Sequence, residues 1–269
     1  MKTISKNCGK CQVASVQTVG ADVRRRGLVT SSPASAFTLI EMLTVIAVIA
    51  VLASLIFPVI GAVEKRQTIN HAQAEMAQLE TAIERYKAAY GFYPPDNPDP
   101  KPKANQYINQ LYFELEGTTY SNGVYTTLDG SAWINSKDLN TVFGPGVNGI
   151  MNCTRPGGGE DSAVARNFLP DLKSKQELII TNANGTYKII VIITSVGGPD
   201  AGYVPLGVHD ANPWRYNSSS PTNNPGAYDL WIQLSIGSTI NSGGVIQQPS
   251  LYLICNWSKQ AQYNLTNWP

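Results

Sequence analysis

The sequence predicts an α+β fold in which one long N-terminal helix packs on a small antiparallel C-terminal sheet. Three observations predict it: an apolar run over residues 37–60, an amphipathic stripe over 61–91, and alternating apolar strands after residue 176. Only 14% of the 269 residues are charged, and an average soluble domain has about 25%, so a solvated helical bundle is disfavoured. The formal net charge of +1 offers no electrostatic footprint for nucleic acid, which we do not expect as a partner.

Residues 1–36 form a basic leader with six basic side chains, one acid and little helical pattern. The next 24 residues, 37–60, contain a single ionisable side chain, Glu41. A bilayer is crossed by about 20 apolar residues in a helix, and the basic flank predicts a cytoplasmic N-terminus. The pattern therefore predicts a single-pass helix over 37–60 that lies in a lipid bilayer.

Glu41 is the residue in this run that needs a functional explanation. A carboxylate inside an apolar span costs about 2.5–3.5 kcal/mol on insertion scales, so intramembrane acids are functional by default. A cleaved secretory signal has about 7–15 apolar residues before its small-residue cleavage site, whereas here Ser35 and Ala36 precede a longer run. A signal anchor without processing is the other alternative, and neither alternative accounts for Glu41.

The residues AFTLIE at 36–41, followed by an unbroken apolar helix, resemble the signal of type IV pilins and type II secretion pseudopilins. The resemblance implies that a prepilin peptidase cuts between Ala36 and Phe37 and methylates the amino group of Phe37. It also implies that Glu41 meets the amino terminus of a neighbouring subunit during assembly. The family usually has glycine where Ala36 stands. Pro58 falls where pilins often carry a proline that loosens the helix, so a helix break is expected there.

The segment 61–91 predicts a second, amphipathic half of the same helix. Apolar residues recur at alternating spacings of three and four, which places them on one helical face. Gly91 and the pair Pro94-Pro95 predict the end of the helix. Packing of this face on a sheet is the favoured use, and a coiled coil is the alternative. The stripe consists of Ile69, Ala72, Met76, Leu79, Ile83, Tyr86 and Tyr90.

Residues 92–176 predict a loop-rich variable region, with one short helical or extended piece at 108–117. Residues 177–269 predict the antiparallel sheet region. Within it, 177–181 and 186–196 indicate a hairpin with Asn184-Gly185 in its turn. The alternation of 228–236 predicts a half-buried strand that pairs with 250–258.

A second resemblance, to the major pseudopilin of type II secretion, covers the letters NPWRY at 212–216, PG at 225–226, YDLW at 228–231 and NW at 256–257. The turn GFYP at 91–94 also fits. The resemblance implies a filament subunit held in the bacterial inner membrane, with its C-terminal domain in the periplasm, that drives export of folded proteins. Its partners would be copies of itself, minor pseudopilins, the prepilin peptidase and the inner-membrane assembly platform. Alternatives are a type IV pilus subunit for adhesion, motility or DNA uptake, and a membrane-tethered binding module.

Calcium is the ligand that the resemblance implies and the residues disfavour. The family binds Ca²⁺ in the loop after the YDL strand, and such an ion needs six to eight oxygen ligands with carboxylates among them. Here the loop 237–250 contains no Asp or Glu, and Asp229 alone cannot form a site. We therefore expect no calcium in that loop, or only a weak site made of carbonyl oxygens, and we expect no cofactor.

The remaining reactive residues do not predict an enzyme. No serine lies in a G-x-S-x-G context, and His71 and His209 are the two histidines of the chain; we expect His71 on a solvated helix face. The pair Cys8 and Cys11 lies in the leader. Cys153 and Cys255 allow either one disulfide in an oxidising compartment or two separately buried thiols. The tryptophans Trp214, Trp231, Trp257 and Trp268 are expected mainly in the core.

Overall fold

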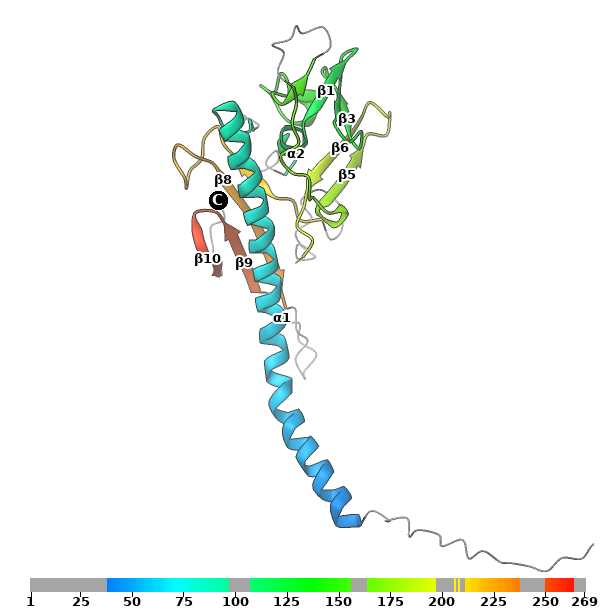
Figure 1. Ribbon diagram of the computed structural model, residues 1–269, viewed down its shortest axis with the longest axis vertical. Coiled ribbons are helices and arrows are strands. Elements are labelled where there is room, and N and C mark those ends of the chain that lie inside the picture. The colour runs from blue at the N-terminus through cyan, green and yellow to red at the C-terminus, as the bar shows by residue number, and fades with distance from the viewer. Residues whose placement is uncertain are drawn as a thin grey trace, which may run out of the picture. The chain divides into compact units, whose positions relative to one another are not determined.

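The computed structural model describes residues 38–96, 107–155, 164–196, 206, 208, 211–237 and 250–263 (Figure 1). The leader and Phe37 lie outside these ranges. The chain divides into two compact units, Met1–Ala53 and Ser54–Pro269.

Helix α1 spans Leu39–Tyr90 over 52 residues. It ends where Gly91 adopts φ +84° and its N–H donates to the carbonyl of Lys87 at 2.7 Å, a backbone conformation that glycine adopts readily. The break expected at Pro58 is not seen, since the backbone is helical on both sides of this residue. A proline removes one i to i−4 hydrogen bond and its ring crowds the carbonyl of residue i−4, but α1 continues through this position. Within the described residues, no helix is sufficiently long and apolar for a membrane crossing.

A six-stranded sheet has the order β4-β1-β2-β3-β6-β5. All its neighbours are antiparallel except β1 and β4, which run parallel. Its strands are β1 (Thr118–Ser121), β2 (Val124–Thr127), β3 (Trp133–Asn135), β4 (Cys153–Thr154), β5 (Glu177–Thr181) and β6 (Tyr187–Ile192). Short helices α2 (Leu111–Glu116) and α3 (Leu139–Val142), and a 3-10 turn at Ser174–Gln176, connect them.

Four strands and two helices of this layer fall in the region 92–176, where we expected few regular elements. Those strands have two to four residues each, which is too short for an alternating pattern to be recognised. They exist through pairing: Trp133 of β3 lies opposite Lys188 of β6. The predicted hairpin of β5 and β6 is present, with Gly185 at φ +61° in its turn.

A four-stranded antiparallel sheet has the order β10-β9-β8-β7. Its strands are β7 (Arg215–Asn217), β8 (Asp229–Ile236), β9 (Ser250–Cys255) and β10 (Ser258–Tyr263). The expected pairing is present, with Trp231 of β8 opposite Cys255 of β9. The predicted strand 250–258 is divided between β9 and β10 by a turn at Asn256-Trp257.

The amphipathic half of α1 packs against both sheets in one hydrophobic core. All seven residues of the predicted stripe lie in this core or against it. Leu230, Ile232 and Leu234 from β8 face the same core, as Figure 1 shows for β8 beside α1. The helix-on-sheet alternative is therefore confirmed for this face over the coiled coil.

Candidate functional site

The first turn of α1 is closed by a reciprocal pair of hydrogen bonds between Thr38 and Glu41. The Thr38 N–H and hydroxyl donate to Glu41 Oε2 at 2.8 and 2.7 Å, and the Glu41 N–H donates to Thr38 Oγ1 at 3.3 Å. This arrangement is a capping box, which satisfies helix donors that have no partner within the helix. The Thr-x-x-Glu spacing of this cap is visible in the sequence, so Glu41 has a local hydrogen-bonding role beside the intermolecular role that the resemblance implies.

Glu41 is the one ionisable residue among the described residues of the first unit, and it is exposed. It lies among ten large apolar side chains, each at least 48% exposed. Such a continuous apolar surface is typical of a protein or membrane interaction site. The surface consists of Leu39, Ile40, Met42, Leu43, Val45, Ile46, Val48, Ile49, Val51 and Leu52.

The proposed cleavage residues Ala36 and Phe37 lie outside the described residues. Both cysteines of the second unit are free and buried. Cys153 belongs to the main core, whereas Cys255 belongs to a separate cluster with Trp231 and Leu253. Of the two alternatives for these cysteines, the structure therefore has the separately buried thiols and no disulfide.

Glu75 connects α1 to the residues that follow β6. Its carboxylate accepts from the Thr194 hydroxyl at 2.6 Å, and from the Ser195 hydroxyl and N–H. His71 is exposed on the helix surface, as expected, and its Nε2 lies 3.5 Å from Glu75 Oε1 and 3.3 Å from Ser195 Oγ. Because the Ser195 hydroxyl donates to Glu75, its proton is engaged there, and the cluster serves as a tether between two segments.

Glu114 lies at the centre of the second unit and is fully buried. It accepts from the Tyr86 hydroxyl at 2.8 Å, the Met151 N–H at 2.9 Å and the Asn152 N–H at 3.0 Å. Burial raises the pKa of Glu114 to about 7, against the opposing effect of these donors. This carboxylate therefore joins α1, α2 and the segment before β4.

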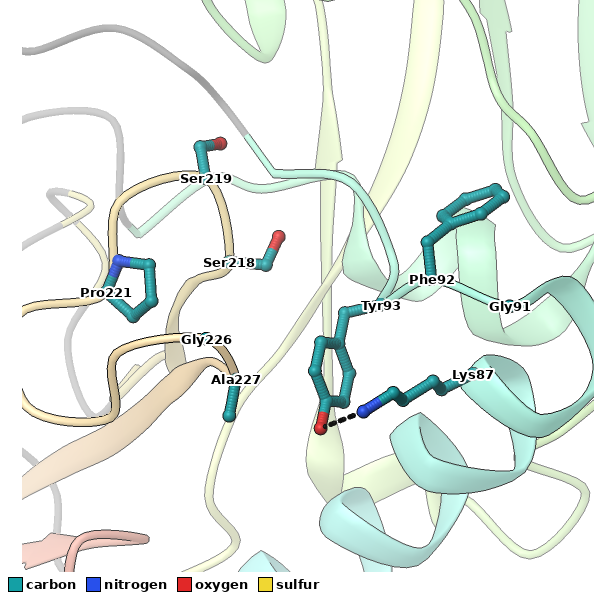
Figure 2. Close-up of a pocket in the computed structure, with 9 residues that line it drawn as sticks. All are labelled: Lys87, Gly91, Phe92, Tyr93, Ser218, Ser219, Pro221, Gly226 and Ala227. Carbon is teal, nitrogen blue, oxygen red and sulfur yellow. Dashed lines mark hydrogen bonds between the residues drawn. The ribbon is translucent and has the colours of Figure 1, made fainter.

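A cavity of about 460 Å³ lies beside the end of α1. Figure 2 shows Lys87 directed at Tyr93, whose hydroxyl accepts from Lys87 Nζ at 2.8 Å. The opposite wall is held by Asp96, which accepts from the Ser218 and Ser219 N–H groups, and burial raises the pKa of Asp96 to about 6. The lining consists of Lys87, Gly91, Phe92, Tyr93, Ser218, Ser219, Pro221, Gly226 and Ala227.

Asp229 stabilises the adjoining loop from within. Its two carboxylate oxygens accept from the backbone N–H groups of Thr222, Asn223 and Asn224 at 2.8 to 2.9 Å, and from Asn223 Nδ2 at 3.1 Å. A bound cation would need the Asp229 oxygens as ligands, but both oxygens already face N–H donors. Among the described residues no cluster of His, Cys, Asp and Glu is placed to hold a metal. Residues 238–249 of the loop 237–250, where we expect no calcium or only a weak site, lie outside the described residues.

Of the tryptophans expected in the core, those that the structure describes are buried or pack against a buried ring. Trp214 and Trp231 are buried, and Trp257 packs on Trp231 with ring centroids 5.9 Å apart. Trp268 lies outside the described residues. These observations agree with the expected core role of the first three tryptophans.

Residues 32–57 match the family described as Prokaryotic N-terminal methylation motif. The match contains the candidate cleavage bond, Thr38 and Glu41, and supports a type IV pilin-like prepilin signal. Comparison with curated proteins and with solved structures gives no significant match.

Proposed function

We propose that this chain is a non-enzymatic subunit of a pilus-like filament, most similar to the major pseudopilin of type II secretion. The observation that carries the proposal is the methylation motif at 32–57, positioned on the exposed apolar start of a 52-residue helix. The second unit supports it, because the same helix continues into an α+β body and provides one side of its core.

Processing is the first step of the proposed function. A prepilin peptidase would hydrolyse the bond between Ala36 and Phe37 on the cytoplasmic side and methylate the new amino group. Removal of the basic leader leaves 14 basic and 18 acidic side chains, a net charge of −4. The processed subunit would wait in the inner membrane with the body in the periplasm, and the assembly platform would then extract it.

Assembly would cover the exposed apolar surface of residues 39–52 with the same surface of neighbouring subunits. Glu41 would then lose its access to water, and the charged amino group of a neighbour's Phe37 would supply its counter-ion. Removing one partner of a buried ion pair costs about 3–5 kcal/mol, because the other charge is left unpaired. The Thr38 donors would occupy the carboxylate until this exchange, so that the free subunit also has a satisfied carboxylate.

The proposed function is tested by deleting the gene and by determining the N-terminal mass of the protein. A methylated Phe37 is expected, whereas an intact Met1 would indicate a membrane-tethered module. Deletion is expected to stop the export of folded proteins. Loss of surface fibres with normal export would instead identify a type IV pilus subunit.

A further inference from the structure

The chain contains five Asn-X-Ser/Thr triplets, which begin at Asn152, Asn184, Asn217, Asn256 and Asn264. This triplet is the acceptor for asparagine-linked glycans on the exposed surface of exported proteins. The reacting group is the carboxamide nitrogen, so a triplet is usable in a folded chain only where that nitrogen is accessible. The structure describes the first four asparagines and distinguishes them sharply.

Three of these four carboxamides are engaged within the fold. Asn152 is fully buried and its Nδ2 donates to the carbonyl oxygens of Glu114 and Arg166 at 2.7 and 2.6 Å. The Nδ2 of Asn256 donates to the Tyr228 carbonyl at 2.9 Å. The Nδ2 of Asn217 donates to the Ser220 carbonyl at 3.0 Å, and its Oδ1 accepts from the Ser220 N–H at 3.0 Å.

Asn184 differs because it lies at the exposed tip of the hairpin between β5 and β6. Its backbone N–H donates to Asn182 Oδ1 at 3.1 Å, but within the described part of the chain its side-chain carboxamide makes no hydrogen bond. The Thr186 hydroxyl of the same triplet accepts from Asn182 Nδ2 at 2.8 Å. The turn therefore holds the hydroxyl in place and leaves the Asn184 carboxamide accessible.

We propose that Asn184 is an acceptor for an asparagine-linked glycan. The co-reactant is a lipid-linked diphosphate oligosaccharide, used by an oligosaccharyltransferase on the side of the membrane to which the body is exported. A bond forms between Asn184 Nδ2 and the anomeric carbon, and the bond from that carbon to the diphosphate oxygen breaks. The lipid diphosphate leaves with the electron pair, and the amide nitrogen loses one proton to a base of the transferase.

A glycan at this tip would protect an exposed strand edge. Strand β5 is at the end of the six-stranded sheet, and its Ile179 is 53% exposed. Unpaired edge strands are prone to pair with other chains, and natural proteins cover or charge them. A bulky hydrophilic group at the end of this hairpin would hinder such pairing. The inference rests on the proposed function in one respect, the export of the body across the membrane.

The test is peptide and N-terminal mass spectrometry of the full processed protein purified from its native host. We expect a sugar-containing mass on the peptide with Asn184, complete loss of it in Asn184→Gln and Thr186→Val, and its retention in Thr186→Ser. Asn122→Gln is the matched control, because Asn122-Gly123-Val124 is also an exposed Asn-Gly turn but has no hydroxyl at the third position.

An unmodified Asn184 in a protein with methylated Phe37 would overturn the glycan proposal and leave the proposed function intact. A glycan on Asn152, Asn217 or Asn256 instead would overturn the argument that accessibility of the carboxamide decides which asparagine is modified. An intact Met1 together with a glycosylated Asn184 would contradict the processing step and support the glycan site. One set of spectra therefore distinguishes a failure of the glycan proposal from a failure of the proposed processing.

Discussion

Glu41 and Glu114 both accept hydrogen bonds from their own chain, but their surroundings differ completely. Glu114 is fully buried and accepts three donors from residues 28 to 38 positions away in sequence. Glu41 is exposed, and its donors come from Thr38, three positions away. A carboxylate held by distant segments stabilises a fold, whereas one held by a local cap is free to exchange partners.

The largest expected effect is that of Glu41→Ala on assembly. The variant should insert and be cleaved normally, but filament yield should fall about a hundredfold or more. The substitution leaves the charged amino group of a neighbour's Phe37 buried without its partner, which costs about 3–5 kcal/mol. Filament yield is measured as the amount of subunit in sheared filaments relative to the amount of processed subunit in the membrane. Glu64→Ala, at an exposed position of α1, is the control. Normal assembly of Glu41→Ala would contradict the proposal that Glu41 exchanges its Thr38 donors for the amino group of a neighbouring subunit.

Glu114→Ala should instead destabilise the body. The substitution leaves the donors of Tyr86, Met151 and Asn152 without their acceptor, and each unsatisfied buried donor costs about 1–3 kcal/mol. We expect a loss of about 3 kcal/mol or more in urea unfolding of the detergent-solubilised processed subunit. Glu84→Ala, on the exposed side of α1, should change the free energy of unfolding little. Equal effects of the two would refute the central role of Glu114.

The body should lose stability as pH rises from 4.5 to about 7. Burial raises the pKa of Glu114 over that interval, so the folded state binds its proton more tightly than the unfolded chain does. The stabilisation is complete below pH 4.5 and is lost as pH passes the folded pKa. Thermal unfolding of wild type and Glu114→Gln across this range measures the effect. The variant should have the shallower pH dependence, and identical profiles would exclude Glu114 as the cause.

Thr38→Val should have a smaller effect than either glutamate substitution. It removes the hydroxyl of the capping box, and loss of such a cap costs about 1 kcal/mol. Hydrogen exchange of the amides in the first turn of α1 should accelerate, while Thr38→Ser should restore protection. An unchanged exchange rate in Thr38→Val would show that the cap does not stabilise the first turn.

Calcium should produce the smallest effect. Both oxygens of Asp229 are directed at N–H donors, and the loop 237–250 contains no acidic residue. The midpoint of thermal unfolding should therefore be the same in CaCl₂ and in EGTA. A calcium-dependent rise of several degrees would contradict this expectation.

The local signals of the chain were sufficient for some parts of the fold and insufficient for others. The stripe from Ile69 to Tyr90 identified the packed face of α1, because helical periodicity is a property of neighbouring residues. Strands β1 to β4 were not predicted because they are short and are stabilised by pairing. Likewise, His71 is exposed as expected, but its contact with Ser195, 124 residues later in the chain, could not be read from local sequence.

Residue types and short spacings were sufficient to predict the prepilin-type signal, the long helix with its two halves, and the pairing of β8 with β9. These features depend on residue type and on spacings of a few residues. Contacts between distant segments make Glu75 and Glu114 internal tethers and direct N–H donors at Asp229. They also leave the Asn184 carboxamide without a hydrogen bond among the described residues. Burial and hydrogen-bond partners depend on contacts between segments up to 186 residues apart, and such contacts are not encoded in local patterns.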